Sequence, residues 1–209
     1  MNPEVVSIQL GLPRCIDDGP ESEQWTSGIF KFPIDHAVSA SATGLEGDGQ
    51  ADLRVHGGPD KAVLVYSLDH FPDWLEECNF DMLPPGAFGE NLSVTELTEE
   101  SVCIGDEWAL GTVVFQVSQP RQPCWKLGRR WNMPDLPKRV VASGRSGWYL
   151  RVLQPGVIEP GPMQLSRRVH PDWTIRRAND VFYNKSEMPE LKTELAALPE
   201  LSAAWKNQL

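Results

Sequence analysis

Short apolar stretches separated by glycine- and proline-containing turns fill the first three-quarters of the chain. Most of them are rich in β-branched residues or alternate apolar with polar residues, which is typical of strands. Many short strands in succession favour a closed or sandwiched β structure, because strands need hydrogen-bonding partners along both edges. A doubly wound α/β fold would need regular helices between the strands. The predicted strands are residues 5–10, 28–32, 38–42, 62–66, 91–95, 107–110, 113–118, 148–153 and 163–169.

Three interruptions of this pattern have helical character. One spans residues 68–78, where apolar side chains recur on one helical face. The second follows Cys124, and the third follows Pro134, a residue suited to the first turn of a helix. The sequence therefore predicts a mainly β fold with a few α additions.

The pattern changes to helix from Asp172 onward. Thr174 is a candidate N-cap, and Pro189 and Pro199 divide the tail into three short helices. Helices of this length are not stable alone and must pack on one another or on the β body. We therefore expect a β domain over residues 1–170 and a three-helix module over residues 171–209. Whether the module covers a pocket, pairs subunits or docks a partner is left open.

Charge and cysteine spacing argue against several classes of protein. The 209 residues carry a net charge of −10, which argues against general binding to nucleic acid or to an anionic membrane. There is no signal-peptide pattern and no apolar run long enough to span a bilayer. The cysteines form no Cys-x-x-Cys pair, so neither a zinc finger nor an iron–sulfur cluster is indicated. We expect a cytoplasmic protein with reduced thiols.

Cys124 opens a basic segment in this otherwise acidic chain. Residues 118–151 hold eight lysines and arginines and a single acidic residue, Asp135, so positive charge is expected to gather around the thiol. Such surroundings favour the thiolate, which is the form that attacks, carries sulfur or ligates a soft metal. The alternative is a buried cysteine that packs as a small hydrophobe beside arginines on a solvated helix face. Trp125, next in sequence, could stack on a planar ligand or simply pack.

The turn Gly-Gly-Pro-Asp at residues 57–60 is flanked by three potentially cationic side chains. Arg54, His56 and Lys61 could bind the phosphate or oxo groups of a ligand that the glycines admit close to the backbone amides. In isolation the same string is equally typical of a surface turn with flanking charges. His56 could also be a histidine satisfied inside the core.

Two further turns are ambiguous in the same way. Asn91 follows the string Gly-Ala-Phe-Gly-Glu and could hydrogen-bond a ligand or close a turn. Glu90 could move protons only if it is partly desolvated, and Asp48, Asp60 or water could do so instead. Arg145 lies in another glycine-flanked turn that leads into a predicted strand.

Taken in order, four strings resemble one known family. They are Gly-Leu-Glu-Gly-Asp at 44–48, His-Gly-Gly-Pro-Asp at 56–60, Gly-Ala-Phe-Gly-Glu-Asn-Leu at 86–92, and Gln-Val-Ser-Gln-Pro-Arg at 116–121 followed by Cys124. This order resembles the MOSC family, the domain shared with the C-terminal part of molybdenum-cofactor sulfurases, and most closely the bacterial YiiM-type proteins. The resemblance covers residues 5–169, and the tail from Asp172 resembles the three-helix module of that subgroup.

The resemblance implies a β-barrel-like body whose pocket holds the molybdenum cofactor (molybdopterin), with one cysteine as a ligand to the metal. By position, Cys124 is the implied molybdenum ligand and catalytic residue. A soft thiolate suits the metal, and cations suit the pterin phosphate. The candidate contacts to the pterin, its phosphate or oxo groups are Arg54, His56, Lys61, Asn91, Arg121 and Arg145.

An activity is implied as well. YiiM-type relatives reduce N-hydroxylated compounds such as hydroxylamino-purines, and other members reduce amidoximes; reduced molybdenum takes the oxygen of an N–OH group and releases the amine. The chain has no flavin or nicotinamide fingerprint, so the electrons would come from a separate reductase, expected to be a flavoprotein. The alternatives are a carrier that holds sulfur as a persulfide on Cys124, and a non-catalytic module that binds the cofactor or another anion. The oligomeric state is left open, with a homodimer as one option.

Overall fold

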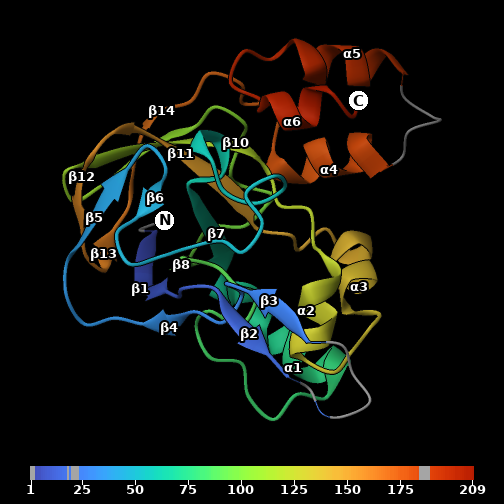
Figure 1. Cartoon of the computed structure of the whole chain (residues 1–209). Coiled ribbons are helices and arrows are strands. Elements are labelled where there is room, and N and C mark those ends of the chain that lie inside the picture. Colours follow the sequence, from blue (N-terminus) through green and yellow to red (C-terminus); the bar gives the residue numbers. More distant parts are fainter. Residues whose placement is uncertain (1–2, 18, 20–23, 184–188) are drawn as a thin grey trace.

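The computed structural model describes residues 3–17, 19, 24–183 and 189–209. Among these residues, nine strands form one sheet: β1 (Glu4–Leu10), β4 (Phe32–Pro33), β7 (Val63–Ser67), β8 (Leu92–Thr95), β9 (Glu107–Leu110), β10 (Val113–Pro120), β11 (Trp148–Gln154), β13 (Gly161–Pro162) and β14 (Gln164–Arg167). The order is β13-β1-β8-β7-β11-β10-β9-β14, and β4 pairs with β1 (Figure 1). Paired strands are antiparallel except β7 and β8, which are parallel.

Consecutive strands bring the two edges of this sheet together. β13 pairs with β1 at one edge and β14 pairs with β9 at the other, yet only Met163 separates β13 from β14 in the chain. Because neighbouring strands lie about 4.8 Å apart, the edges of a flat sheet of this width would be about 30 Å apart. The sheet must therefore curl into a barrel-like body whose two edges meet at Met163, which is buried. This confirms the predicted fold class.

Two smaller sheets accompany the main one. β5 (Val38–Ser41) pairs with β6 (Gly44–Leu45) and with β12 (Gly156–Ile158), while β2 (Arg14–Ile16) pairs with β3 (Trp25–Ser27). Eight of the nine predicted strands overlap an observed strand by at least four residues. The strands that were not predicted, β2, β3, β4, β6, β12 and β13, are only two or three residues long, too short for an alternating pattern to show.

The predicted strand over residues 28–32 is wrong. β3 ends before this segment, and β4 begins at its last residue. The carbonyl of Ile29 accepts a hydrogen bond from Arg130 Nη1 at 2.5 Å instead of joining a sheet. The Ile29 side chain also lies against Gly89, where an added Cβ would stand 2.8 Å from Ile29 Cγ1. This apolar run therefore packs against a glycine turn and a helix.

Three helices pack together beside the sheet: α1 (Phe71–Cys78), α2 (Trp125–Arg130) and α3 (Leu136–Ser143) (Figure 1). A 3-10 turn, η2 (Leu68–His70), precedes α1, so the helix predicted over residues 68–78 is confirmed in two parts. α2 follows Cys124 as predicted. α3 begins at Leu136 rather than after Pro134 directly, and Pro137 occupies its first turn, where a missing N–H removes no helical hydrogen bond.

The C-terminal helices form the predicted three-helix module: α4 (Ile175–Tyr183), α5 (Pro189–Ala197) and α6 (Ala203–Lys206) (Figure 1). Thr174 caps α4 as predicted, since its Oγ1 accepts the N–H of Arg177 at 3.1 Å. Ile175, Phe182 and Trp205 belong to the same buried cluster as the barrel side chains. The module and the barrel therefore share one core. Among the described residues, no helix is long and apolar enough to cross a membrane.

The shared core predicts that barrel and module unfold together. Trp205 is fully buried, and its ring centroid lies 4.3 Å from that of Phe182, so Trp205→Ala should lower the free energy of unfolding by about 3–5 kcal/mol. Trp125 is 56% exposed and contacts Trp25, so the matched control, Trp125→Ala, should cost no more than about 1.5 kcal/mol. Urea unfolding followed by circular dichroism and by tryptophan fluorescence should give one coincident transition. An early, separate transition of the module would contradict the shared core.

Candidate functional site

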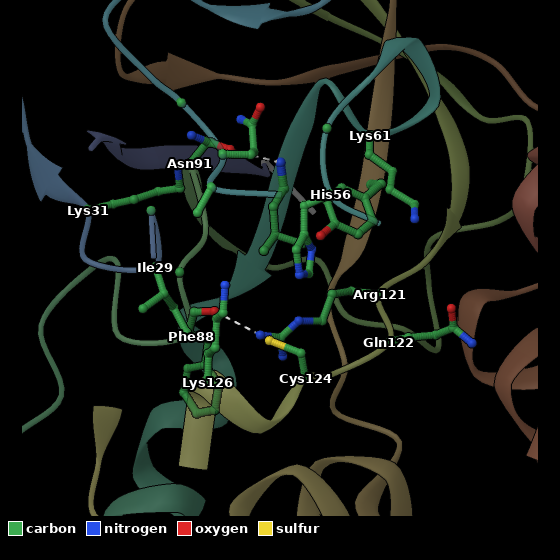
Figure 2. A pocket seen from close by; sticks show the side chains of 18 residues that line it. Ile29, Lys31, His56, Lys61, Phe88, Asn91, Arg121, Gln122, Cys124 and Lys126 are labelled. Atoms are coloured by element: carbon green, nitrogen blue, oxygen red, sulfur yellow. Dashed lines mark hydrogen bonds between the residues drawn. The ribbon is translucent and has the colours of Figure 1, made fainter. Parts of the chain in front are cut away.

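A cleft opens over the face of the sheet, and residues far apart in sequence line it (Figure 2). Part of its floor follows the strand register, because Tyr149 of β11 pairs with Leu64 of β7 and both residues line the cleft. Its walls come from segments 28–31, 49–61, 88–91 and 121–126. We call it the Cys124 cleft. The residues predicted from the sequence that line it are Cys124, His56, Lys61, Asn91 and Arg121.

Cys124 lies half-buried at the start of α2, with its thiol directed into the cleft (Figure 2). Its carbonyl accepts the N–H of Leu127 at 3.1 Å, which begins the helix. All four cysteines are free, and the other three do not line the cleft. Cys15 is exposed, whereas burial raises the pKa of Cys78 and raises that of Cys103 to about 11. Cys124 is thus the thiol that faces the cleft.

Arg121 lies beside Cys124 and is buried, with 5% of its surface exposed (Figure 2). Its Nη2 donates a hydrogen bond to the carbonyl of Phe88 at 3.0 Å. Its Nη1 is buried as well and has no hydrogen-bond partner among the described residues. A buried cationic donor without an acceptor is costly. An anion bound in the cleft would supply the missing acceptor.

A tight turn brings His56 and Lys61 to the cleft. Gly57 and Gly58 have φ angles of 80° and 83°, in the left-handed region that favours glycine. The turn continues into a 3-10 helix, η1 (Pro59–Lys61), and Lys61 Nζ donates to the carbonyl of Val55 at 2.9 Å. Both side chains therefore face the cavity from one short segment (Figure 2).

Basic side chains line the cleft, and none of the described residues that line it is an Asp or Glu. Burial lowers the pKa of His56, and the nearby charges of Lys126, Lys61 and Arg121 lower it further. Burial also lowers the pKa of Lys61, although Asp60 opposes this shift. Several cations in a partly desolvated cavity favour an anionic ligand over a neutral one.

Two lysines of the cleft were not predicted from the sequence. Lys31 is buried and forms an ion pair with Asp48, and burial lowers its pKa while Asp48 raises it. Lys126 donates from Nζ to the carbonyl of Thr26 at 2.8 Å. Lys126 follows Cys124 by two residues, a spacing that could have identified it. Lys31 reaches the cleft through tertiary folding alone, so no local signal marks it.

Asp48 and Asn91 hold the loops around the cleft together. Asp48 Oδ2 accepts a hydrogen bond from Asn91 Nδ2 at 3.0 Å, and Oδ1 accepts from Lys31. Asn91 Nδ2 also donates to the carbonyl of Gln9 at 3.2 Å, and its Oδ1 accepts the N–H of Leu64 at 3.1 Å. Both polar atoms of the Asn91 side chain are therefore engaged within the protein. Asn91 lines the cleft as part of its scaffold.

Glu90 stabilises the turn that precedes β8. Its carboxylate accepts the N–H of Gly86 at 2.6 Å, the N–H of Phe88 at 2.9 Å and the hydroxyl of Ser93 at 2.9 Å. Burial raises the pKa of Glu90, and these hydrogen bonds oppose that shift. Glu90 is fully buried and does not line the cleft. Its position accounts for the glycine-rich string at 86–91 without a direct contact to a ligand.

The structure does not bring Arg54 or Arg145 to the cleft. The Arg54 side chain is 88% exposed, and its Nη2 pairs with Asp52 Oδ2 at 2.8 Å. Arg145 points toward α1, where it pairs with Asp73 at 3.1 Å and with Glu77 at 2.6 Å. Nearby carboxylates therefore engage both arginines outside the cavity.

The basic segment around Cys124 is also less concentrated than its sequence predicts. Arg151 pairs with Asp60 at 2.8 Å, and Arg139 pairs with Asp135 at 2.8 Å. Arg130 donates to backbone carbonyls under the turn at Gly86. Of the eight cations in residues 118–151, the cleft is lined by two, Arg121 and Lys126. The other six cations are near Cys124 in sequence, but sequence proximity does not show where a long side chain finds its partner.

A second hollow adjoins the Cys124 cleft and shares part of its wall, including Cys124 and Tyr149. We call it the outer hollow. Val55, Gln119 and Trp125 line the outer hollow but not the Cys124 cleft. The Trp125 ring centroid lies 5.6 Å from that of Trp25. Cys124 thus borders both a cationic cleft and a hollow with aromatic side chains.

Metal ligands are sparse around these cavities. Within the described ranges, no group of three or more His, Cys, Asp or Glu side chains is placed to hold a metal ion. A metal at Cys124 would therefore need most of its ligands from a bound cofactor.

Comparison with known proteins assigns the chain to a family. The model of the MOSC domain matches residues 52–163, and the model of the YiiM-like 3-alpha helix domain matches residues 173–209. The chain is 42% identical to the Bacillus subtilis protein YflK, over 97% of this chain and 90% of YflK.

Two further relatives extend the comparison. A Gibberella moniliformis protein named "Reductase" is 40% identical over 93% of this chain, which spans 35% of that longer protein. The crystal structure of YiiM from Geobacillus stearothermophilus superimposes with a TM-score of 0.82 at 38% identity, covering 98% of this chain and 96% of that one. The chain therefore belongs to the MOSC domain family, in the YiiM-like group that carries a C-terminal three-helix domain.

Proposed function

We propose that this protein is a molybdenum-cofactor-dependent reductase of N-hydroxylated compounds. The observation that carries the proposal is a half-buried thiol, Cys124, beside the unpartnered buried Nη1 of Arg121 in a cationic cleft. Membership of the MOSC family supports the use of molybdenum cofactor. The Gibberella moniliformis relative named "Reductase" supports reduction as the type of reaction.

The residues of the cleft fit this cofactor. A thiolate at Cys124 is a soft ligand of the kind that suits molybdenum. In this proposal Arg121, His56 and Lys61, which line the cleft, bind a phosphate group, and that group would satisfy Nη1 of Arg121. A cofactor that brings its own sulfur ligands also matches a cleft in which Cys124 is the cysteine that lines the cavity.

The proposed reaction converts R–NHOH, two electrons and two protons into R–NH2 and water. When bound, the cofactor would supply a redox-active molybdenum that accepts the oxygen of the N–OH group. Cys124 would hold the metal where the cleft meets the outer hollow, within reach of a substrate that enters the hollow. The exposed ring of Trp125 offers a face on which a planar substrate such as a hydroxylamino-purine can stack.

Electrons come from a separate reductase in this proposal, and a flavoprotein is the donor that we propose. The sequence contains no flavin or nicotinamide fingerprint that would let the chain draw on these carriers directly. Activity should therefore require a second protein.

Replacing Cys124 should remove the metal. Protein expressed in a host that makes molybdenum cofactor should contain stoichiometric molybdenum and pterin, and Cys124→Ala should lose most of the molybdenum. Cys15→Ala removes an exposed thiol outside the cleft and should retain it. Elemental analysis and pterin fluorescence measure both contents. A wild type without metal from a cofactor-replete host would overturn the molybdoenzyme proposal, and a persulfide on Cys124 of that protein would favour the sulfur carrier.

Replacing Arg121 should weaken anion binding at a specific place. A hydrogen bond to a charged group contributes about 1.5–3 kcal/mol, so Arg121→Gln should bind inorganic phosphate roughly 10- to 100-fold more weakly in calorimetric titrations of the metal-free protein. Arg54→Gln removes an equal charge from an exposed side chain of the neighbouring loop and should change the affinity by less than about twofold. Equal losses in both variants would show general charge attraction instead of a site at Arg121. Thermal melts confirm that each variant is folded.

A further inference from the structure

The C-terminal module touches the strand end that carries the cleft residues. We propose that Ser202, at the start of α6, is a positioning residue that holds Gln119 and, through it, Arg121 in the geometry that binds an anion. The module would then help to hold the anion-binding residues of the cleft in position. This inference rests on the anion site of the proposed function and concerns this chain's own residues.

The hydroxyl and the backbone N–H of Ser202 together make three hydrogen bonds. Ser202 is fully buried, and its hydroxyl accepts the N–H of Trp205 at 3.2 Å. Because a hydroxyl has a single hydrogen, that hydrogen is free to be donated to Gln119 Oε1 at 2.7 Å. The backbone N–H of Ser202 donates to the carbonyl of Ser118 at 2.9 Å. The module therefore hydrogen-bonds two consecutive residues of β10, Ser118 and Gln119.

Gln119 passes this constraint on to Arg121. Since its Oε1 faces Ser202, its Nε2 is turned toward the carbonyl of Pro120, to which it donates at 3.2 Å. That carbonyl belongs to the peptide group that joins Pro120 to Arg121. On the other side of this peptide group, the N–H of Arg121 donates to the carbonyl of Gly147 at 3.0 Å. The backbone that carries the guanidinium is thus held from both sides.

The end of β10 needs such support because β9 does not pair with the last residues of this strand. β9 pairs with β10 as far as Gln116, and the segment before β9 bonds Val117, whose N–H donates to the carbonyl of Asp106 and whose carbonyl accepts the N–H of Gly105, both at 2.9 Å. Beyond that point Ser118 meets three elements: its carbonyl accepts from Ser202, and its hydroxyl lies 2.5 Å from the carbonyl of Asp60 and 3.1 Å from that of Tyr149. Asp60 precedes the cleft residue Lys61. The module, the cleft turn and β11 therefore converge on Ser118.

A second contact reinforces the same junction. Gln122, which lines both the Cys124 cleft and the outer hollow, donates from Nε2 to Gln208 Oε1 at 3.3 Å. Gln119 lines the outer hollow. Two wall residues of the cavities are therefore oriented by residues that follow the barrel in sequence.

The competing explanation is that Ser202 merely caps α6. The module offers a matched control for that explanation, because Thr174 caps α4 through its own side chain and does not line either cavity. Thr174→Ala and Ser202→Ala each remove an N-cap, so both should lower the Tm. Ser202→Ala should in addition release Gln119.

The test is phosphate affinity of the full-length, metal-free chain, measured by calorimetry well below the Tm of every variant. Ser202→Ala should bind inorganic phosphate about tenfold more weakly, the size of loss typical when a residue that orients a ligand-binding group is removed. Gln119→Met should show a similar loss, and the double variant should lose no more than either single one, because both break the same link. Thr174→Ala should bind phosphate as wild type does, and Ser202→Thr, which keeps the hydroxyl, should restore binding.

Several results would overturn the inference. Wild-type affinity in Ser202→Ala despite a lowered Tm would leave Ser202 as a helix cap alone. Additive losses in the double variant would show that Ser202 and Gln119 act separately, and equal losses in Thr174→Ala would show a general effect of stability. A wild type that does not bind phosphate would remove the anion site itself. None of these readouts depends on molybdenum, so the molybdenum content of the wild type judges the proposed function separately.

Discussion

The meeting of both sheet edges at Met163 constrains the whole molecule. A strand in an open sheet can slip in register at modest cost, but a slip in a sheet closed on itself must be matched by every other strand. The register that places Leu64 beside Tyr149 is therefore fixed, and these two residues provide a rigid floor for the cleft. Loops that carry chemistry need such a scaffold, because their own backbones make few regular hydrogen bonds.

Two buried carboxylates extend this rigidity into the loops. Asp48 joins Lys31 and Asn91, and Glu90 gathers two backbone N–H groups of the turn before β8. From sequence alone, acidic residues in glycine-rich strings are expected to face solvent or to contact a ligand. In this fold they are internal acceptors, which leaves the cations of the cleft as the groups available to a ligand.

Much of the fold was predictable because strands of four or more residues carry an alternating pattern, whereas pairs and triplets of residues do not. The site residues also differ in how far local sequence marks them. Cys124, His56, Lys61 and Arg121 sit in glycine- or proline-containing strings whose turns bring them to the cavity. The placement of Arg145 was not predictable, since its carboxylate partners lie about seventy positions earlier in the chain, on α1. Long-range pairing of this kind leaves no local trace.

The distribution of thiols has a consequence for handling the protein. Cys78 and Cys103 are buried, and their raised pKa values keep them protonated at neutral pH, so alkylating agents and mild oxidants cannot reach a reactive form of either. Such reagents meet Cys15 on the surface and Cys124 at the cleft. In a Cys15→Ala background, a thiol-directed label would therefore report on the cavity, and thiol oxidation during storage in air would fall first on Cys124.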